Sequence, residues 1–427
     1  MQARAHELIP GGAHTYAKGD DQYPRNAPPF MVRGEGAHVW SADGREFIEY
    51  GMGLRAVTLG HAHPSVTRAA MAQMQLGTNF GRPSPIEVEC AESLVDLIDG
   101  AEMAKFTKDG STANTAAIKL ARAYTGRDMV ALCGDHPFFS YDDWAMCVTD
   151  VDAGIPAGTR ELTATFRYND IASVEALFAE HPGRIACLIL EPAKDRHPED
   201  DFLGRLRDLC HANGALLIFD EMITGFRWHE RGAQHYYGVT PDLSTFGKAL
   251  GNGFAISALV GTREVMRLGG LDHDRERVFL LSTTHGAESH AMAAAVEVMR
   301  IYREERVVER LHAAGRRLVE GFEQAITAAD CEGHIAAVGM PWCLVYHTRD
   351  PQQRPSQPYR TLFMQEMIAR GVIGPSLILS AAHTDEDIDR TVEALAGAMT
   401  VYRKALDDGT EPYLDGPPTK SVYRRFN

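Results

Sequence analysis

Four short segments of the sequence carry residues whose types and spacing could do chemistry together. The first, KDGSTANT, places Gly110, Ser111 and Thr112 where an apolar run ends and a helix would begin. Glycine lets a ligand approach the backbone closely, and the N–H groups at a helix start attract an anion such as a phosphate. Ordinary helix capping by the two hydroxyl residues explains this segment equally well when it is taken alone.

The next two segments offer a carboxylate and an amine. ALLIFDEMITGFR delivers Asp220 from the end of an apolar run, and LSTFGKALGNG surrounds Lys248 with glycine and apolar residues. A carboxylate in a partly dry pocket stays ionised only beside a cation, and a protonated pyridine nitrogen would be such a partner. A desolvated lysine loses its proton readily and can act as a nucleophile and then as a base. Taken singly, a structural ion pair or helix cap at Asp220 and a solvated Lys248 are the simpler explanations.

The fourth segment, LLSTTHGAES, places Thr283 and His285 before Gly286, at the start of a stretch that reads as one long helix over 287–325. In isolation this segment too is explained by helix capping. This segment becomes informative only together with the other three, which precede it in the chain.

The elements that must position these segments follow from the hydrophobic pattern. Between residues of about 102 and 290, short apolar runs alternate with amphipathic helices, which predicts an α/β domain with a mostly parallel sheet. The runs are MAKFT, DMVALC, IACLILEP, ALLIFDE and AISALVG, and helices are expected over 113–124 and 200–213. Glu191 and Asp220 follow two of the runs directly, at the carboxyl ends of strands, where ligands bind in open α/β sheets.

The rest of the chain carries weaker patterns. Alternating residues in FMVRGEGAHVWSADGREFIEY predict a strand pair, and helices are expected over 65–76 and 86–98. After the fourth segment, IAAVG and WCLVYH read as strands. Helices are expected over 360–370 and 385–406.

Bulk properties limit the function classes. The chain has 427 residues, and at ~150 residues per domain this suggests two to three domains. A formal net charge of -15 argues against broad nucleic-acid binding. The seven cysteines form no C-x-x-C pair, so neither a disulfide framework nor a metal site is expected. No secretory signal and no run of about 20 apolar residues is visible, so we expect a cytoplasmic protein that does not cross a membrane.

In their order along the chain, the segments resemble the class III, fold-type I pyridoxal-phosphate aminotransferases, within them the glutamate-1-semialdehyde aminomutase-like group. The resemblance extends from IPGGAHTY to about residue 400 and includes LGHAHP, GSTANTAAIKLARAYTGRD, GALLIFDEMITGFR, YYGVTPDLSTFGKALGNG and STTHG. It implies a large, mostly parallel-sheet α/β domain and a smaller α+β domain. We expect 1–50 to join the small domain, 51–290 to form the large cofactor-binding domain, and 291–427 to form the small domain with a surface tail.

The resemblance also implies a cofactor, pyridoxal 5′-phosphate (PLP). Lys248 would hold the cofactor as a Schiff base, and Asp220 would contact the pyridine nitrogen. Met222 would pack against the ring. In relatives an aromatic residue stacks on the cofactor, and in the corresponding segment CGDHPFFSYDDW this position falls on His136, with Phe138 close enough to compete.

Further roles concern the phosphate and the subunits. Gly110 and Ser111 would hold the phosphate, with Thr112 as an additional candidate. The resemblance implies a homodimer with shared active sites, in which Thr283 would reach the phosphate of the neighbouring subunit. Glu191 would lie just behind the residues that contact the cofactor.

Two segments depart from the aminomutase pattern. PGGAHTYAKG carries Lys18 near the position where aminomutases have an arginine for the substrate carboxylate, and lysine does not replace arginine in bidentate recognition. The loop that reads GSWGP in aminomutases is GMGLRAV here and contains Arg55. Arg55 is therefore a candidate for binding a donor carboxylate, with a surface salt bridge as the equal alternative.

These departures favour a transaminase that moves an amino group from an amino-acid donor such as glutamate to a separate aldehyde or ketone. The segments PGGAHTYAKGDDQ, GDHPFFSYDDW and STTHGAES resemble aminotransferases that act on oxidised sugars, including aminoglycoside and surface-polysaccharide intermediates. The alternative is an intramolecular aminomutase of the glutamate-1-semialdehyde type. A third possibility, a scaffold that binds the cofactor without catalysis, is disfavoured by the presence of both Lys248 and Asp220.

Replacing Arg55 by alanine is expected to raise the KM for an amino-acid donor, because the guanidinium would no longer bind its carboxylate. Steady-state kinetics with the donor varied would measure this, and an unchanged KM would exclude the role.

Overall fold

The structure, a computed structural model, describes residues 1–136 and 139–426. These residues form two compact units. One comprises Met1–His63 together with Glu309–Asn427, and the other comprises Pro64–Val308. The borders of these units lie later in the chain than the domain borders expected after residues 50 and 290.

The second unit contains a seven-stranded sheet with the strand order β4-β10-β9-β8-β7-β5-β6. β10 is antiparallel to both of its neighbours, and the remaining neighbouring strands are parallel, as the hydrophobic pattern predicts. The strands are β4 (Met103–Thr107), β5 (Met129–Cys133), β6 (Thr163–Phe166), β7 (Ile185–Leu190), β8 (Leu216–Asp220), β9 (Leu243–Phe246) and β10 (Ser257–Gly261). Every residue of β7 and β8 is buried, which explains why their sequences are continuous apolar runs rather than alternating ones.

Five of these strands coincide with the five apolar runs, and two were not predicted. β6 and β9 have four residues each, and TATF and LSTF mix polar and apolar residues. Lys248 follows β9 by two residues, so this strand positions it.

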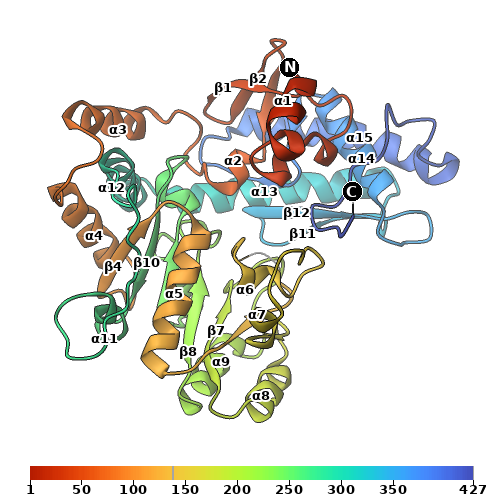
Figure 1. Cartoon of the computed structure of the whole chain (residues 1–427). Helices are drawn as coiled ribbons and strands as arrows, with labels where there is room; N and C mark the ends of the chain where they lie inside the picture. Colours follow the sequence, from red (N-terminus) through yellow and green to blue (C-terminus); the bar gives the residue numbers. More distant parts are fainter. Residues whose placement is uncertain (137–138, 427) are drawn as a thin grey trace. The chain divides into compact units, whose positions relative to one another are not determined.

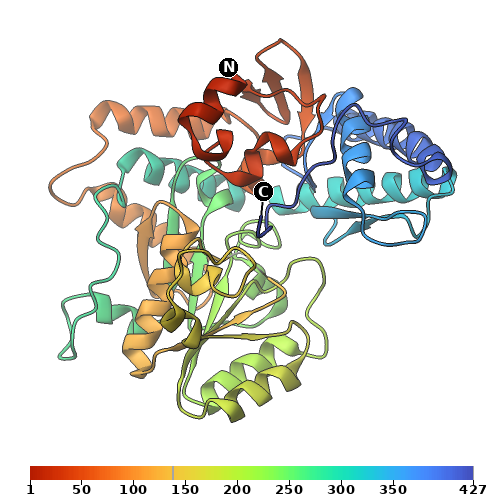
Figure 2. The same cartoon turned by 45° about the vertical axis from the view of Figure 1, so that its right-hand side comes forward.

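Helices of the second unit pack on this sheet. α5 contacts β7, β8, β9 and β10, and α9 contacts β8. Figure 1 shows α5, in orange, in front of the sheet, and Figure 2 shows α8 and α9 side by side. The helices are α3 (Pro64–Leu76), α4 (Pro85–Leu97), α5 (Gly110–Thr125), α6 (Asp143–Met146), α7 (Ala157–Glu161), α8 (Ile171–Glu180), α9 (Phe202–Ala212), α10 (Ala233–Tyr237), α11 (Arg263–Met266) and α12 (Ser289–Glu304).

The long helix predicted over 287–325 is wrong as a single element. The chain forms α12 and then a separate α13 (Val307–Ala328). Between them Arg306 has a φ of 44°, in the left-handed region, which breaks the helix. Apolar periodicity continues on both sides of the break, so the pattern alone did not reveal it.

The first unit contains two small sheets. Strands β1 (Met31–Glu35), β2 (His38–Ser41), β3 (Glu46–Glu49) and β13 (Val372–Ile373) form one, and β11 (Ile335–Val338), β12 (Cys343–Thr348) and β14 (Leu377–Ile378) form the other. The predicted strand pair near the start is therefore three strands joined by a fourth. Helices of this unit are α1 (Gln2–Leu8), α2 (Met52–Arg55), most of α13, α14 (Gln357–Ala369) and α15 (Asp385–Asp408).

Across residues 1–136 and 139–426, no helix is long and apolar enough to span a membrane. Within the same ranges, no cluster of three or more His, Cys, Asp or Glu side chains is arranged to hold a metal ion.

Candidate active site

Three of the predicted segments meet at one edge of the large sheet. β4, β8 and β9 all run toward this edge, because β10 is antiparallel to both β4 and β9. Asp220 at the end of β8 pairs with Thr245 of β9, and Thr107 at the end of β4 pairs with Ser257 at the start of β10. The segments that carry Gly110, Asp220 and Lys248 therefore leave neighbouring strands on the same side, as expected of the carboxyl edge of an open α/β sheet.

Asp220 is a buried carboxylate with a defined set of donors. Its side chain is 3% exposed. Oδ1 accepts a hydrogen bond of 2.9 Å from the Met222 backbone N–H, and Oδ2 accepts one of 2.8 Å from the Asn114 amide. Burial raises the pKa of Asp220, while the charge of Lys248 and the two hydrogen bonds oppose the shift. Asp220 is thus shielded from water, and a cationic partner would stabilise its ionised form.

Met222 connects the three segments through packing. A Cβ atom added to Gly110 would lie 2.9 Å from the Met222 sulfur, and one added to Gly247 would lie 2.6 Å from it. The Ser257 hydroxyl is 4.0 Å from the same sulfur. A Cβ atom at either position would therefore force the Met222 side chain to shift, and with glycine there the thioether packs against both the start of α5 and the Lys248 segment.

Lys248 begins a short 3-10 helix, η4 (Lys248–Gly251), directly after Gly247. Its backbone φ is 45°, in the left-handed region that a residue with a side chain adopts at a cost of about 1–3 kcal/mol. Strain of this kind is maintained only where the surrounding packing determines it, and it is frequent at active sites. The lysine is partly buried, and its charge acts on Asp220.

The start of α5 differs from the capping explanation in one respect. The N-cap is Asp109, whose carboxylate accepts hydrogen bonds of 2.9 Å from both the backbone N–H and the hydroxyl of Thr112. Ser111 is buried, and its hydroxyl accepts a hydrogen bond from the Tyr141 N–H at 3.2 Å. Both hydrogen-bond donors of Thr112 are therefore used by Asp109. Gly110 and Ser111 belong to the first turn of the helix, where backbone N–H groups have no acceptor within the helix.

His136 is buried beyond the end of β5. Its ring lies 4.9 Å from that of Tyr168 and 6.4 Å from that of Phe139. Burial lowers the pKa of His136 to about 3, with the charges of Lys194 and Arg196 acting in the same direction. The imidazole is therefore neutral and can stack on an aromatic ring. The competing candidate, Phe138, lies outside the described residues.

The other predicted residues lie as follows. Glu191 is buried directly after β7. Thr283 is exposed, in the loop that precedes α12. Lys18 is exposed at the end of a 3-10 helix, η2 (Tyr16–Lys18), and Arg55 is partly buried at the end of α2, both in the first unit.

Two polar residues at the site were missed by the sequence analysis. Asn114 donates to Asp220, and the Thr245 hydroxyl donates to the Asn114 oxygen at 2.6 Å. An amide one turn after Gly110, on a helix face that is otherwise alanine and isoleucine, was the available signal for Asn114.

Glu221 has a supporting role next to Asp220. Its buried carboxylate accepts hydrogen bonds from Ala233 N–H at 2.9 Å, from Gln234 N–H at 2.7 Å and from the Thr224 hydroxyl. Burial raises the pKa of Glu221 to about 7 against these hydrogen bonds. Glu221 thereby holds the turn that follows the end of β8.

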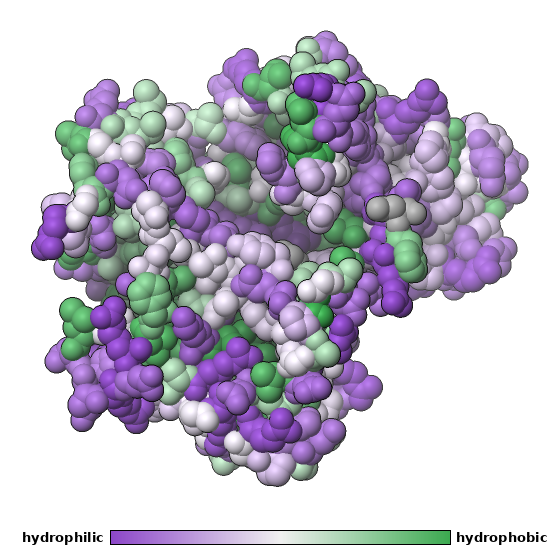
Figure 3. Space-filling view, in the orientation of Figure 1, coloured by the Kyte–Doolittle hydropathy of each residue, from purple (hydrophilic) through white to green (hydrophobic). Residues whose placement is uncertain are grey.

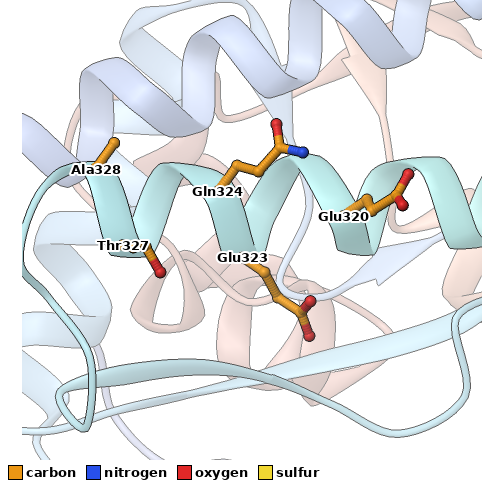
Figure 4. A pocket seen from close by; sticks show the side chains of 5 residues that line it. All are labelled: Glu320, Glu323, Gln324, Thr327 and Ala328. Carbon is orange, nitrogen blue, oxygen red and sulfur yellow. The ribbon is translucent and has the colours of Figure 1, made fainter.

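A separate hollow lies along α13 in the first unit, where the lining side chains project from successive turns (Figure 4). Its lining combines two carboxylates with an amide, a hydroxyl and a methyl group. The lining residues are Glu320, Glu323, Gln324, Thr327 and Ala328. This lining includes no lysine and none of the predicted site residues.

Comparisons with known proteins identify the family of the chain. A model of the family described as aminotransferase class-III matches residues 20–398. A glutamate-1-semialdehyde 2,1-aminomutase from Desulforudis audaxviator is 35% identical over 421 residues, covering 93% of this chain and 96% of that protein.

Solved structures are similar over nearly the whole chain. The PLP internal aldimine form of the FumI protein of Sphingopyxis sp. MTA144 has a TM-score of 0.87 at 30% identity, covering 95% of this chain and 96% of that one. An omega-transaminase from Sphaerobacter thermophilus has a TM-score of 0.84 at 28% identity, covering 94% and 97%.

The described residues fit the cofactor of this family on their own chemistry. The buried carboxylate of Asp220 suits a protonated ring nitrogen, the amine of Lys248 suits an aldehyde, and the first turn of α5 beside Gly110 suits a phosphate. With the family model matching most of the chain, these features support one conclusion. The chain belongs to the class III aminotransferases and is an α/β, fold-type I enzyme that depends on pyridoxal 5′-phosphate.

Proposed function

We propose that this enzyme transfers an amino group to a carbonyl carbon of a small molecule, with PLP held by Lys248 and paired through its ring nitrogen with Asp220. The observation that carries the proposal is the Asp220 carboxylate, buried at the sheet edge and stabilised by two hydrogen bonds and by the charge of Lys248. A carboxylate in this setting favours a cationic partner, and the partner that the family's cofactor offers is its ring nitrogen.

When bound, PLP supplies an aldehyde that condenses with amines and a ring that accepts electrons. In the proposed roles, Lys248 binds the cofactor and, once released as a free amine, moves the proton at its Nζ atom between the reacting carbons. Asp220 keeps the ring nitrogen protonated, and Met222 and His136 pack against the ring. Gly110 and Ser111 bind the phosphate, whereas Thr112 is the weakest candidate because Asp109 already accepts from it.

Two forms of the reaction compete, and different observations support each. Intermolecular transfer, the main prediction from the sequence, is supported by the lysine at position 18 and by the altered loop around Arg55. Met52, Leu54 and Arg55 all have φ between 42° and 70°, so this loop holds a strained, left-handed turn of the kind that occurs at functional sites. The similarity to an omega-transaminase points the same way.

Intramolecular exchange, the alternative, has the stronger support from the comparisons. Five curated relatives are glutamate-1-semialdehyde 2,1-aminomutases that are 33–35% identical, and each matches more than nine tenths of this chain. We keep this reaction as the second candidate function.

For the intermolecular form we propose an oxidised sugar or aminoglycoside-type intermediate as the acceptor and an amino acid such as glutamate as the donor. Three segments that depart from the aminomutase pattern, PGGAHTYAKGDDQ, GDHPFFSYDDW and STTHGAES, support this acceptor class.

We also propose a homodimer in which Thr283 serves the neighbouring subunit's phosphate site. Thr283 is exposed on the isolated chain, as a residue that reaches another subunit would be. Met71, Met74, Leu76 and Phe80, on and after α3, are each about half exposed or more. Figure 3 shows hydrophobic residues, in green, on the surface over α3 and α4. Several large apolar side chains exposed in one segment are typical of a protein interface.

Replacing Asp220 by asparagine is expected to lower kcat by about a hundredfold or more, because a neutral amide cannot stabilise the positive charge on the ring nitrogen. Asp220→Glu, which retains the charge, should keep more activity than Asp220→Asn. Both variants would be measured as holoenzymes with the same donor and acceptor. Equal activity of Asp220→Asn and the unaltered enzyme would contradict the role.

The two forms of the reaction are distinguished by the fate of the donor. Intermolecular transfer should release one keto acid per amine formed, measurable by chromatography after incubation with glutamate and a panel of oxo-sugars. The aminomutase form should convert glutamate-1-semialdehyde with no donor and no keto acid. If the enzyme converts the semialdehyde but forms no amino sugar from any oxo-sugar of the panel and releases no keto acid from glutamate, the intermolecular form is rejected.

Subunit sharing can be tested by complementation. Lys248→Ala and Thr283→Ala are each expected to be impaired, but a mixed dimer contains one site with both residues intact. Coexpression of the two variants should therefore restore activity and cofactor binding, measured on dimers purified with two different tags. Activity no higher than the sum of the separate variants would show that Thr283 serves its own subunit or none.

A further inference from the structure

We infer that Asn114 is a positioning residue that orients the Asp220 carboxylate and ties it to the segment carrying His136. The inference rests on the proposed function, because it concerns how the chain presents Asp220 to a cofactor ring. Its evidence is a set of buried hydrogen bonds within the second unit.

Asn114 lies at the centre of four chain segments. It is on α5 and is completely buried. Its Nδ2 group donates to Asp220 Oδ2 at 2.8 Å and to the Phe139 carbonyl oxygen at 2.6 Å, and its Oδ1 atom accepts from the Thr245 hydroxyl at 2.6 Å. The amide thus uses both of its donor hydrogens and one lone pair of its oxygen on groups from three other segments.

The hydrogen-bond partners of Asn114 determine which way its amide faces. The Asp220 carboxylate and the Phe139 carbonyl oxygen can only accept, so both require the Nδ2 group, and the Thr245 hydroxyl then donates to Oδ1 and holds the amide in that orientation. In the reversed orientation an oxygen would face the carboxylate, which is repulsive. Thr245 is itself held on β9, where its carbonyl oxygen accepts from the Glu221 N–H at 2.9 Å.

The hydrogen bond from Asn114 has an electrostatic and a geometric consequence. Each oxygen of Asp220 receives one donor, Oδ1 from Met222 and Oδ2 from Asn114, so the ionised form is favoured against burial and the plane of the carboxylate is fixed. Loss of the Asn114 donor would leave Asp220 less ionised and free to turn about its side-chain torsion.

The second donor hydrogen reaches the loop after β5. Phe139 is buried, and its carbonyl oxygen has the Asn114 amide as a hydrogen-bond partner. This loop also carries His136, whose ring contacts that of Phe139. The Asn114 amide therefore fixes the position of Asp220, proposed to pair with the ring nitrogen, relative to the segment with His136, proposed to pack on the ring face.

The test compares Asn114→Ala, Thr245→Val and the matched control Thr245→Ser. Each is measured by the dissociation constant for PLP added to the apoenzyme, by the visible circular dichroism of the bound cofactor, and by the thermal midpoint of the apoenzyme. Thr245→Val removes only the hydroxyl, and Thr245→Ser retains it.

We expect Asn114→Ala to weaken PLP binding on the order of tenfold, the usual effect of losing one hydrogen bond to an ionised group. The cofactor dichroism should fall in parallel. Thr245→Val should cause a smaller change in the same direction, roughly threefold, since the amide loses the hydrogen bond that holds its oxygen but keeps both of its donor contacts. Thr245→Ser should match the unaltered enzyme.

The outcomes separate this inference from the proposed function. If the unaltered chain binds no PLP, the proposed function fails. If it binds PLP, and Asn114→Ala and Thr245→Val lower only the thermal midpoint of the apoenzyme, Asn114 is merely structural and the inference is overturned. If Asn114→Ala does not fold, the dissociation constants of Thr245→Val and Thr245→Ser for PLP are compared, and equal values overturn the inference.

Discussion

The charge of a single buried carboxylate is the constraint on which the site depends. Asp220 is removed from water at the end of β8, where an ionised group is unfavourable unless other groups compensate for the lost hydration. Two hydrogen bonds and the positive charge of Lys248 supply part of that compensation. A protonated ring nitrogen would complete it. In the proposed function, the burial that destabilises the ionised form of Asp220 in the free protein is what would give it affinity for a cationic ring.

The fold brings the required groups together by a simple rule of sheet topology. Parallel strands β4, β8 and β9 end at one edge, and the residues that follow them start α5, turn past Met222, and enter η4. Close approach of these segments requires that no Cβ atom stand between them and the Met222 sulfur. Gly110 and Gly247 satisfy this condition, which explains why glycines lie beside the residues proposed to carry the chemistry.

Much of this arrangement could be predicted from sequence, and the errors have physical causes. Continuous apolar runs identified the buried strands, and Asp220 and Glu191 were placed at strand ends because they follow such runs directly. β9 was missed because four residues of mixed polarity carry no clear period. Asp109, rather than Ser111 or Thr112, caps α5, since any of these side chains can serve as a cap and only the backbone shows which one does. Asn114 was missed because its partners come from three distant segments, and no local pattern contains that information.

The central claim, that the amine of Lys248 holds the cofactor, has a direct chemical test. Borohydride reduction of the holoenzyme followed by proteolysis and mass spectrometry would locate the attached pyridoxyl group. We predict that the label is on Lys248 alone. A label on another amine, or no covalent label on a holoenzyme that retains its cofactor, would contradict the account.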